Sequence, residues 1–184
     1  MDIQKAKIKG EHFFFNINKG IKKDSIQFKK IQLAVSEFVK KGKDNLLNHL
    51  IQSGYISEYK KAENLIANVG KNVIARLLAG DNTYTGEVNY GAVGDGTTPF
   101  TAGSIKLNNE IYRMTPSSQS FDGAITYLDF FIAEGDTPNI TIEEWATFID
   151  GNASADSGQA FSLLITNSWV KSGSIYISSK YTII

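Results

Sequence analysis

The chain has 184 residues, no cysteine and a formal net charge of zero at pH 7. This length suits one medium domain with an ordinary hydrophobic core, and the missing cysteines exclude disulfides, zinc-thiolate centres and thiol catalysis. No apolar run approaches the roughly 20 residues that a membrane-spanning helix needs, so we expect no membrane partner.

The charges are distributed unevenly along the chain. Residues 1–80 hold 15 Lys/Arg and 7 Asp/Glu, whereas residues 81–184 hold 4 and 12. Such a basic half and acidic half can indicate a nucleic-acid arm, attraction between the two halves, or head-to-tail contact between copies. The lysines are scattered and Arg76 is the single arginine of the basic half, which argues against nucleic-acid binding.

The chain begins with a strand pattern followed by a helix pattern. Aromatic and β-branched residues within 5–18, above all the run His12–Ile17, predict a strand. Residues 25–33 fit a second strand. From Ile31 the apolar positions instead recur at helical spacing, which favours an amphipathic helix up to Lys41.

A second short helix is predicted over 45–52, with Asp44 as its N-cap and Gly54 where a C-cap glycine is expected. Residues 57–61 fit either the start of another helix or a polar link. We therefore interpret residues 1–60 as a basic segment, a strand hairpin plus short helices, that serves as a docking element.

The middle of the chain combines a helix, a strand and a glycine-rich turn. Apolar residues recur at three and four over 71–79 and predict a helix. Residues 88–93 predict a strand that ends in the loop 94–99, whose glycines suit positive φ or close backbone approach. Residues 107–114 fit a short helix or an extended segment.

The remainder predicts strands separated by turn signals. In 124–133 both faces of the alternation are largely apolar, so we expect a central strand that is covered on both sides. The other expected strands are 140–149, 160–166 and 174–183, with loops at 150–158 and 167–173. We predict a mainly β fold, an antiparallel β-sandwich or jelly-roll-like domain over 61–184, after the basic α/β segment.

Three successive motifs resemble a class of tailed-bacteriophage structural proteins. They are N-L-I-A-N-V-G-K-N-V-I-A-R-L-L-A-G, then Y-G-A-V-G-D-G-T-T, then L-N-N-E-I-Y-R. Two later strands, 140–148 and 174–178, also match that pattern, except that Trp145-Ala146 replaces a usual glycine. The resemblance covers about 64–184 and has no counterpart for the helical insertion at 31–52.

The resemblance implies a non-enzymatic virion component that is tail-associated, fibre-associated or on the capsid surface. We therefore expect other virion proteins as partners, a homo-oligomer and no cofactor. The alternative is a carbohydrate-binding or host-surface-binding sandwich. Its candidate contact residues are aromatic, because aromatic anchors carry binding energy. Tyr84, Tyr90 and Trp169 are the candidates for this surface, with Trp169 in an exposed loop, whereas Trp145 is expected in the core.

Other motifs favour structural roles. Gly94 and Gly96 lack the lysine and helix that follow a phosphate-binding loop, so we interpret them as a structural turn. Glu110 and Arg113 are three residues apart and form a structural pair, on a helix surface or buried against the sheet. Loop acids that could bind calcium lack the required D-x-D-x-D-G spacing. These acids are Asp81, Glu87, Asp95 and Asp156.

The titratable residues give little basis for catalysis. Glu143 and Glu144 point to opposite faces of a strand, so they do not form an acid–base pair. Asp129 and Glu143 could do so across strands, as in glycosidases, although exposed or satisfied carboxylates are the simpler interpretation. His12 and His49 stand alone in the sequence. We expect no metal site and no enzyme activity.

Overall fold

The computed structural model describes residues 7–137 and 139–184. Two five-stranded antiparallel sheets pack face to face, so the predicted mainly β sandwich is confirmed. Sheet A has the order β2 (Ile56–Glu63), β1 (Ile8–Ile17), β10 (Ser174–Ile183), β7 (Ile125–Ile132), β6 (Ser118–Asp122). Sheet B has the order β3 (Leu65–Ile66), β9 (Gln159–Val170), β8 (Thr141–Ile149), β4 (Val88–Gly94), β5 (Glu110–Met114).

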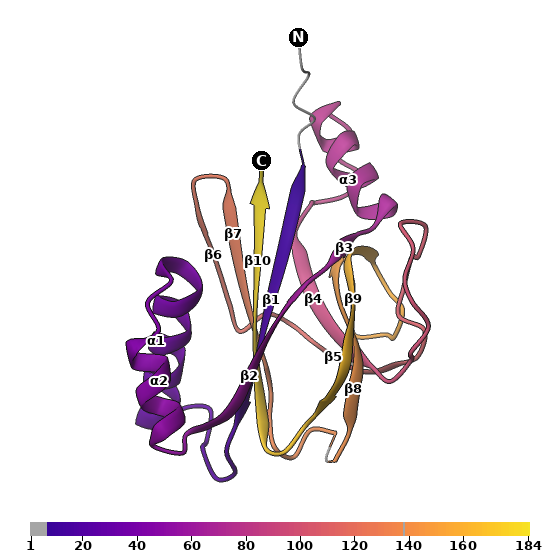
Figure 1. Cartoon of the computed structure of the whole chain (residues 1–184). Coiled ribbons are helices and arrows are strands. Elements are labelled where there is room, and N and C mark those ends of the chain that lie inside the picture. Colours follow the sequence, from indigo (N-terminus) through magenta and orange to yellow (C-terminus); the bar gives the residue numbers. More distant parts are fainter. Residues whose placement is uncertain (1–6, 138) are drawn as a thin grey trace.

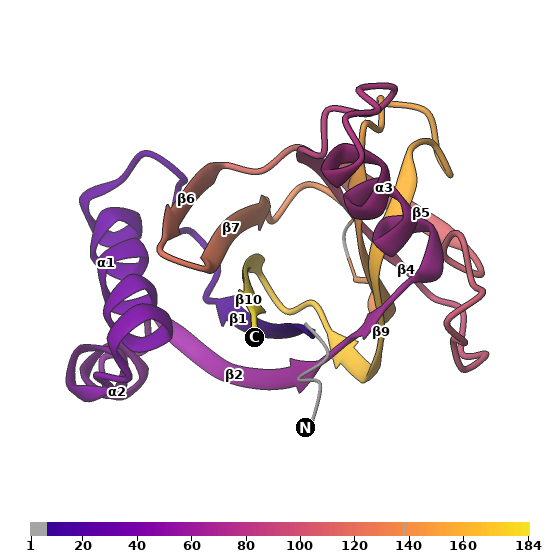
Figure 2. The same cartoon turned by 90° about the horizontal axis from the view of Figure 1, so that it is seen from above.

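Helices cover the outer face of sheet A and one end of the sandwich. Helices α1 (Ile26–Lys41) and α2 (Asn45–Gln52) lie together on sheet A, as Figures 1 and 2 show, while α3 (Asn68–Leu78) packs beside β9. Apolar side chains of α1 such as Phe28 and Ile31 contact Phe15 and Tyr176 of the sheet. The apolar stripe of this amphipathic helix therefore packs against the outer face of sheet A.

Strand β7 shows how the alternation of side chains builds two cores. Leu128, Phe130 and Ile132 point between the sheets, whereas Tyr127 and Phe131 face the helices. Since successive side chains of a strand point to opposite faces, one strand serves both cores. The predicted central strand with two covered faces is confirmed.

The expected boundary at residue 60 does not separate two parts of the molecule. Strand β1 lies in the interior of sheet A between β2 and β10, with Ile8 opposite Ile183. The two ends of the described chain therefore lie side by side (Figure 1), and Lys7 donates its N–H to the carbonyl of Ile184 at 2.7 Å. Among the described elements before residue 60, the helices α1 and α2 lie outside the sheets, whereas β1 and β2 belong to sheet A.

Several predicted elements need correction. The strand alternative for 25–33 is wrong, because Ser25 accepts a hydrogen bond from the Phe28 N–H at 3.1 Å and begins the helix. Residues 57–61 are neither helix nor link but belong to the edge strand β2. Residues 110–114 take the extended alternative. Strand β6 was not predicted.

The expected loop 167–173 is largely part of a strand. Strand β9 continues to Val170, and its turn-forming residues Asn167 and Ser168 adopt positive φ inside the strand. Here the β8–β9 register shifts, so the residues form a bulge rather than a loop. The expected start of the first strand at Lys5 lies outside the described residues.

Candidate functional site

The glycine-rich turn is held by a buried carboxylate on the outer face of sheet B. Glu144 of β8 is fully buried and accepts the backbone N–H groups of Asn108 and Asn109 at 2.6 and 3.2 Å. A Cβ on Gly96 would collide with this carboxylate, and one on Gly94 with the Asn109 carbonyl. Both glycines are therefore needed for close approach, not for positive φ, and the turn is structural as predicted.

Glu110 and Arg113 form a buried ion pair on β5. Two parallel bonds of 2.7 and 2.9 Å join the guanidinium to the carboxylate, and the side chains are only 4% and 3% exposed. The third guanidinium nitrogen, Nη1, donates to the Ser157 carbonyl at 2.9 Å. The pair therefore holds the loop 150–158 against the sheet, which is the buried alternative from the sequence.

The candidate aromatic residues do not form a common surface. Trp169 is 5% exposed and packs against Phe14 between the sheets, so its predicted exposure is wrong. The ring of Tyr90 lies on the outer face of sheet B with Arg113 above it at 5.4 Å, and Tyr84 has Arg76 above it at 5.2 Å. Without Trp169, no shared aromatic platform supports the glycan-binding alternative.

The carboxylates considered for catalysis lie apart. Asp129 belongs to β7 of sheet A and accepts a hydrogen bond from Ser118 at 3.1 Å, whereas Glu143 belongs to β8 of sheet B and accepts one from Ser168 at 2.7 Å. The proposed cross-strand pair is therefore wrong. Within residues 7–137 and 139–184, no group of three or more His, Asp or Glu could hold a metal ion.

Three of the four candidate calcium residues, Asp81, Asp95 and Asp156, are instead engaged by local partners. Asp156 pairs with Lys106 at 2.6 Å. Hydrogen bonds from Thr83, and then from Arg76, lower the pKa of Asp81 to about 2. These acids stabilise loops rather than converge on one point.

His12 belongs to a hydrogen-bonded network between the sheets that the sequence did not reveal. The Trp145 indole N–H donates to His12 Nδ1 at 3.1 Å, and Ser179 donates to the same nitrogen at 2.7 Å. Because an indole nitrogen can only donate, Nδ1 must be unprotonated and the hydrogen of the neutral ring lies on Nε2, near Ser162. Burial lowers the pKa of His12 to about 3, which agrees with this neutral form.

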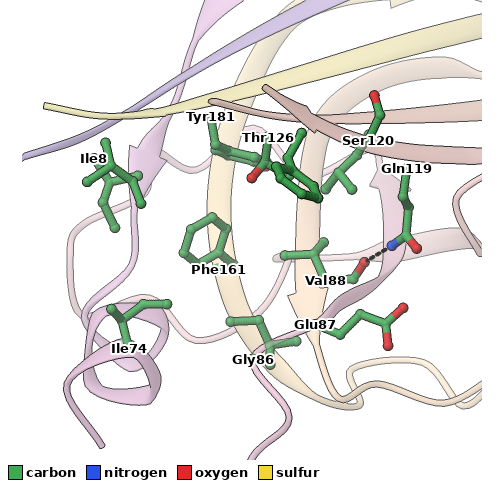
Figure 3. A pocket seen from close by; sticks show the side chains of 14 residues that line it. Ile8, Ile74, Gly86, Glu87, Val88, Gln119, Ser120, Thr126, Phe161 and Tyr181 are labelled. Atoms are coloured by element: carbon green, nitrogen blue, oxygen red, sulfur yellow. Dashed lines mark hydrogen bonds between the residues drawn. The ribbon is translucent and has the colours of Figure 1, made fainter. Parts of the chain in front are cut away.

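Tyr181 extends this network to the wall of a cavity. Its hydroxyl contacts Thr147 and Ser162 at 2.7 and 2.8 Å, and burial raises its pKa. Its ring lies beside Phe161, with 5.0 Å between ring centres. Both aromatic rings face the open space between the sheets in Figure 3.

The cavity measures about 560 Å³ and lies at the end of the sandwich near α3. Its inner wall is apolar and buried, with Leu128, Ile149 and Phe161 no more than 6% exposed. Its rim carries Phe121 and Ile183, which are 82% and 60% exposed. No sequence motif indicated this site, because its lining comes from eight separate segments, and no single segment indicates a cavity.

The surface charge separates between the outer helices and the loops of sheet B. Residues 19–53, which include α1 and α2, hold eight lysines and three acids. Lys22, Lys23, Lys29, Lys30 and Lys40 are exposed there. The acids of the other half lie largely in loops. The helical face is therefore positive, with five more lysines than acids, although Glu37 pairs with Lys41 at 2.6 Å.

Comparison with known proteins gave no match: neither a protein-family model, nor a curated protein, nor a solved structure is similar to this chain at a significant level. Within the described residues no helix is long and apolar enough to cross a membrane.

Proposed function

We propose that this chain is a non-enzymatic structural component of a tailed-bacteriophage virion and assembles there in multiple copies. One observation carries the proposal: two of the motifs that resemble phage structural proteins, the glycine-rich turn and the Glu–Arg segment, hold loops on the outer face of sheet B. Gly94 and Gly96 admit the Glu144 carboxylate, and Glu110 holds Arg113. These residues build a rigid outer surface, which is what a component packed among neighbours requires.

The separation of charge supports contact between copies. The exposed lysines of α1 and of the loops that flank it give one face a positive potential, and residues 81–184 carry eight more acids than bases. Opposite charges on two faces of one molecule favour head-to-tail association, which closes into rings when the rotation allows it. Since β1 and β2 belong to sheet A, the docking element that we propose is reduced to α1 and α2.

The location on a particle can be tested directly. An antibody against the chain should detect it in tailed particles purified by density gradient from the source culture, at a constant ratio to a major particle protein. Treatment that strips loosely bound host proteins should leave this ratio unchanged. Absence of the chain from intact particles would contradict the virion role.

Assembly can be tested by light scattering coupled to size exclusion at low and high salt. We expect an oligomer at about 50 mM salt that dissociates as ionic strength rises, since exposed charges are screened beyond the Debye length. The double variant Lys29→Glu/Lys30→Glu on α1 should shift the mass toward the monomer. Lys71→Glu on α3, an equally exposed lysine, should not. If the measured mass changes neither with salt nor in the double variant, the charged faces are not the interface.

A further inference from the structure

We propose that the cavity at the end of the sandwich is a binding site for a small uncharged or cationic molecule with an aliphatic or aromatic body. This site is independent of the loops on sheet B that carry the proposed function. Protein interiors contain few voids larger than a water molecule. An apolar cavity of about 560 Å³ falls within the size range of ligand pockets.

The wall of the cavity offers carbon rather than unpaired polar groups. Three of its polar side chains already have partners within the protein: Gln119 donates to the Val88 carbonyl at 2.9 Å, and Ser120 accepts from Lys40 at 3.0 Å. The Tyr181 hydroxyl is held by Thr147 and Ser162. Figure 3 shows the Gln119 amide turned to the Val88 carbonyl beside the aromatic rings. A ligand therefore gains by burying apolar surface.

Two charged side chains bear on the charge of the ligand: Glu87 lines the cavity, and Lys40 contacts the lining through Ser120. Glu87 is the single charged side chain among the lining residues of the described chain and is exposed. A head group that emerges beside this carboxylate is favoured when cationic or neutral and repelled when anionic. The exposed side chains of Phe121 and Ile183 form an apolar rim. This rim adds contact area for the apolar body of the ligand.

The test is calorimetric titration of the full-length protein with octylammonium, 1-octanol and octanoate at neutral pH. We expect one site per chain for octylammonium and octanol, and binding of octanoate that is weaker by about fivefold or more. The variant Glu87→Gln should remove the difference between the two charged probes. The absence of heat for all three probes would overturn the proposal, and equal binding of the charged probes would overturn the assigned mouth.

A matched pair of variants places the probe inside the cavity. Val88→Trp fills the space from β4 and should weaken the binding of octylammonium by about tenfold or more, because apolar surface is no longer available. Val170→Trp adds the same side chain at an exposed position at the other end of β9 and should bind as the parent does. If Val88→Trp does not fold, Ile74→Trp on α3 fills the cavity from a half-buried position. Binding that survives a folded filling variant, or that appears only with a change of oligomeric mass in light scattering, would overturn the assignment.

Discussion

Buried polar side chains in this protein connect segments that are far apart in sequence. Glu144 holds the turn at Asn108 and Asn109, Arg113 holds the loop at Ser157, and His12 joins Trp145 to Ser179. Removing one partner of a buried bond leaves the other unsatisfied, which costs more than the bond contributes. Single residues of this kind should therefore have large effects on stability.

The first residue-scale prediction concerns the Glu144 carboxylate. Glu144→Gln keeps the shape but places an amide NH₂ or a weaker acceptor against two backbone donors. We expect a loss of about 2 to 3 kcal/mol in the free energy of unfolding measured with urea. The neighbouring Glu143→Gln is the control, because Glu143 bonds to Ser168 at the surface. It should cost less than about 1 kcal/mol, and equal losses for both variants would contradict the assigned role.

His12 gives a prediction for the pH dependence of stability. The folded-state pKa, about 3, lies below the ordinary value of 6.5, so between these values the unfolded chain binds a proton that the native protein does not. Stability is thus complete above pH 6.5 and falls as the pH drops through this window, by about 2 kcal/mol between pH 7 and pH 5. Urea unfolding across this range measures the slope.

Two variants separate His12 from the other titrating groups. His12→Gln should lower the stability at pH 7, since the network is disturbed, and should flatten the slope between pH 7 and pH 5. His49→Gln removes an exposed histidine of α2 and should keep the parental slope. A parental slope in folded His12→Gln would show that His12 does not set the pH dependence.

At the scale of elements, the two outer helices begin in different ways. Ser25 caps α1 through its side chain, whereas Asp44 sits at the predicted N-cap of α2 but its side chain makes no capping bond. Ser25→Ala should therefore cost about 1 kcal/mol of unfolding free energy. Asp44→Ala should cost only a few tenths of a kcal/mol. Thermal unfolding of the two variants measured in parallel compares these costs. Equal costs would contradict this difference in capping.

Elements with a regular pattern could be predicted from the sequence, and those shaped by tertiary pairing could not. The α2 helix and strands β7, β8 and β10 follow from periodicity and flanking turn residues. Strand β2 could not, because its exposed lysines and glutamates read as a polar link, and it is extended because β1 pairs with it. Strand β6 lies at the opposite edge of sheet A and is also mostly polar. It could not be predicted for the same reason.

The candidate sites show the same division. The spacing of Glu110 and Arg113 indicated their pairing, because the two residues are near in sequence. Trp169 was misplaced because Asn167 and Ser168 are turn formers that here produce a bulge. The His12 network and the cavity join residues more than 100 positions apart, and a single sequence carries no signal for such pairings.

At the scale of the whole molecule, sheet A cannot be built from residues 61–184 alone. Deletion of residues 1–60 removes β1 and most of β2 and exposes one edge of β10 along ten paired positions. It also removes α1 and α2, which cover the apolar side chains on the outer face of sheet A. We expect the truncated chain to be unfolded or aggregated, with loss of near-ultraviolet circular dichroism and of cooperative thermal unfolding.

An internal deletion serves as the comparison for this truncation. Replacing residues 20–54 by a short flexible linker removes α1 and α2 but keeps the strand pairing of β1 with β2. This variant should retain more secondary structure than the truncation, although its stability should be reduced. A cooperatively folded 61–184 fragment would show instead that the boundary at residue 60 is real.

The central position of β10 affects how the protein forms during synthesis. Strand β10 joins the β1–β2 pair to the β6–β7 hairpin, and it is synthesised after all the other strands of the two sheets. The β1–β2 pair of sheet A must therefore wait, with one unpaired edge, until residues 174–183 have been translated. Domains generally fold as units and open strand edges promote aggregation. We expect that nascent chains stalled before residue 174 remain sensitive to protease, and that protection arises only once residues 174–183 have left the ribosome.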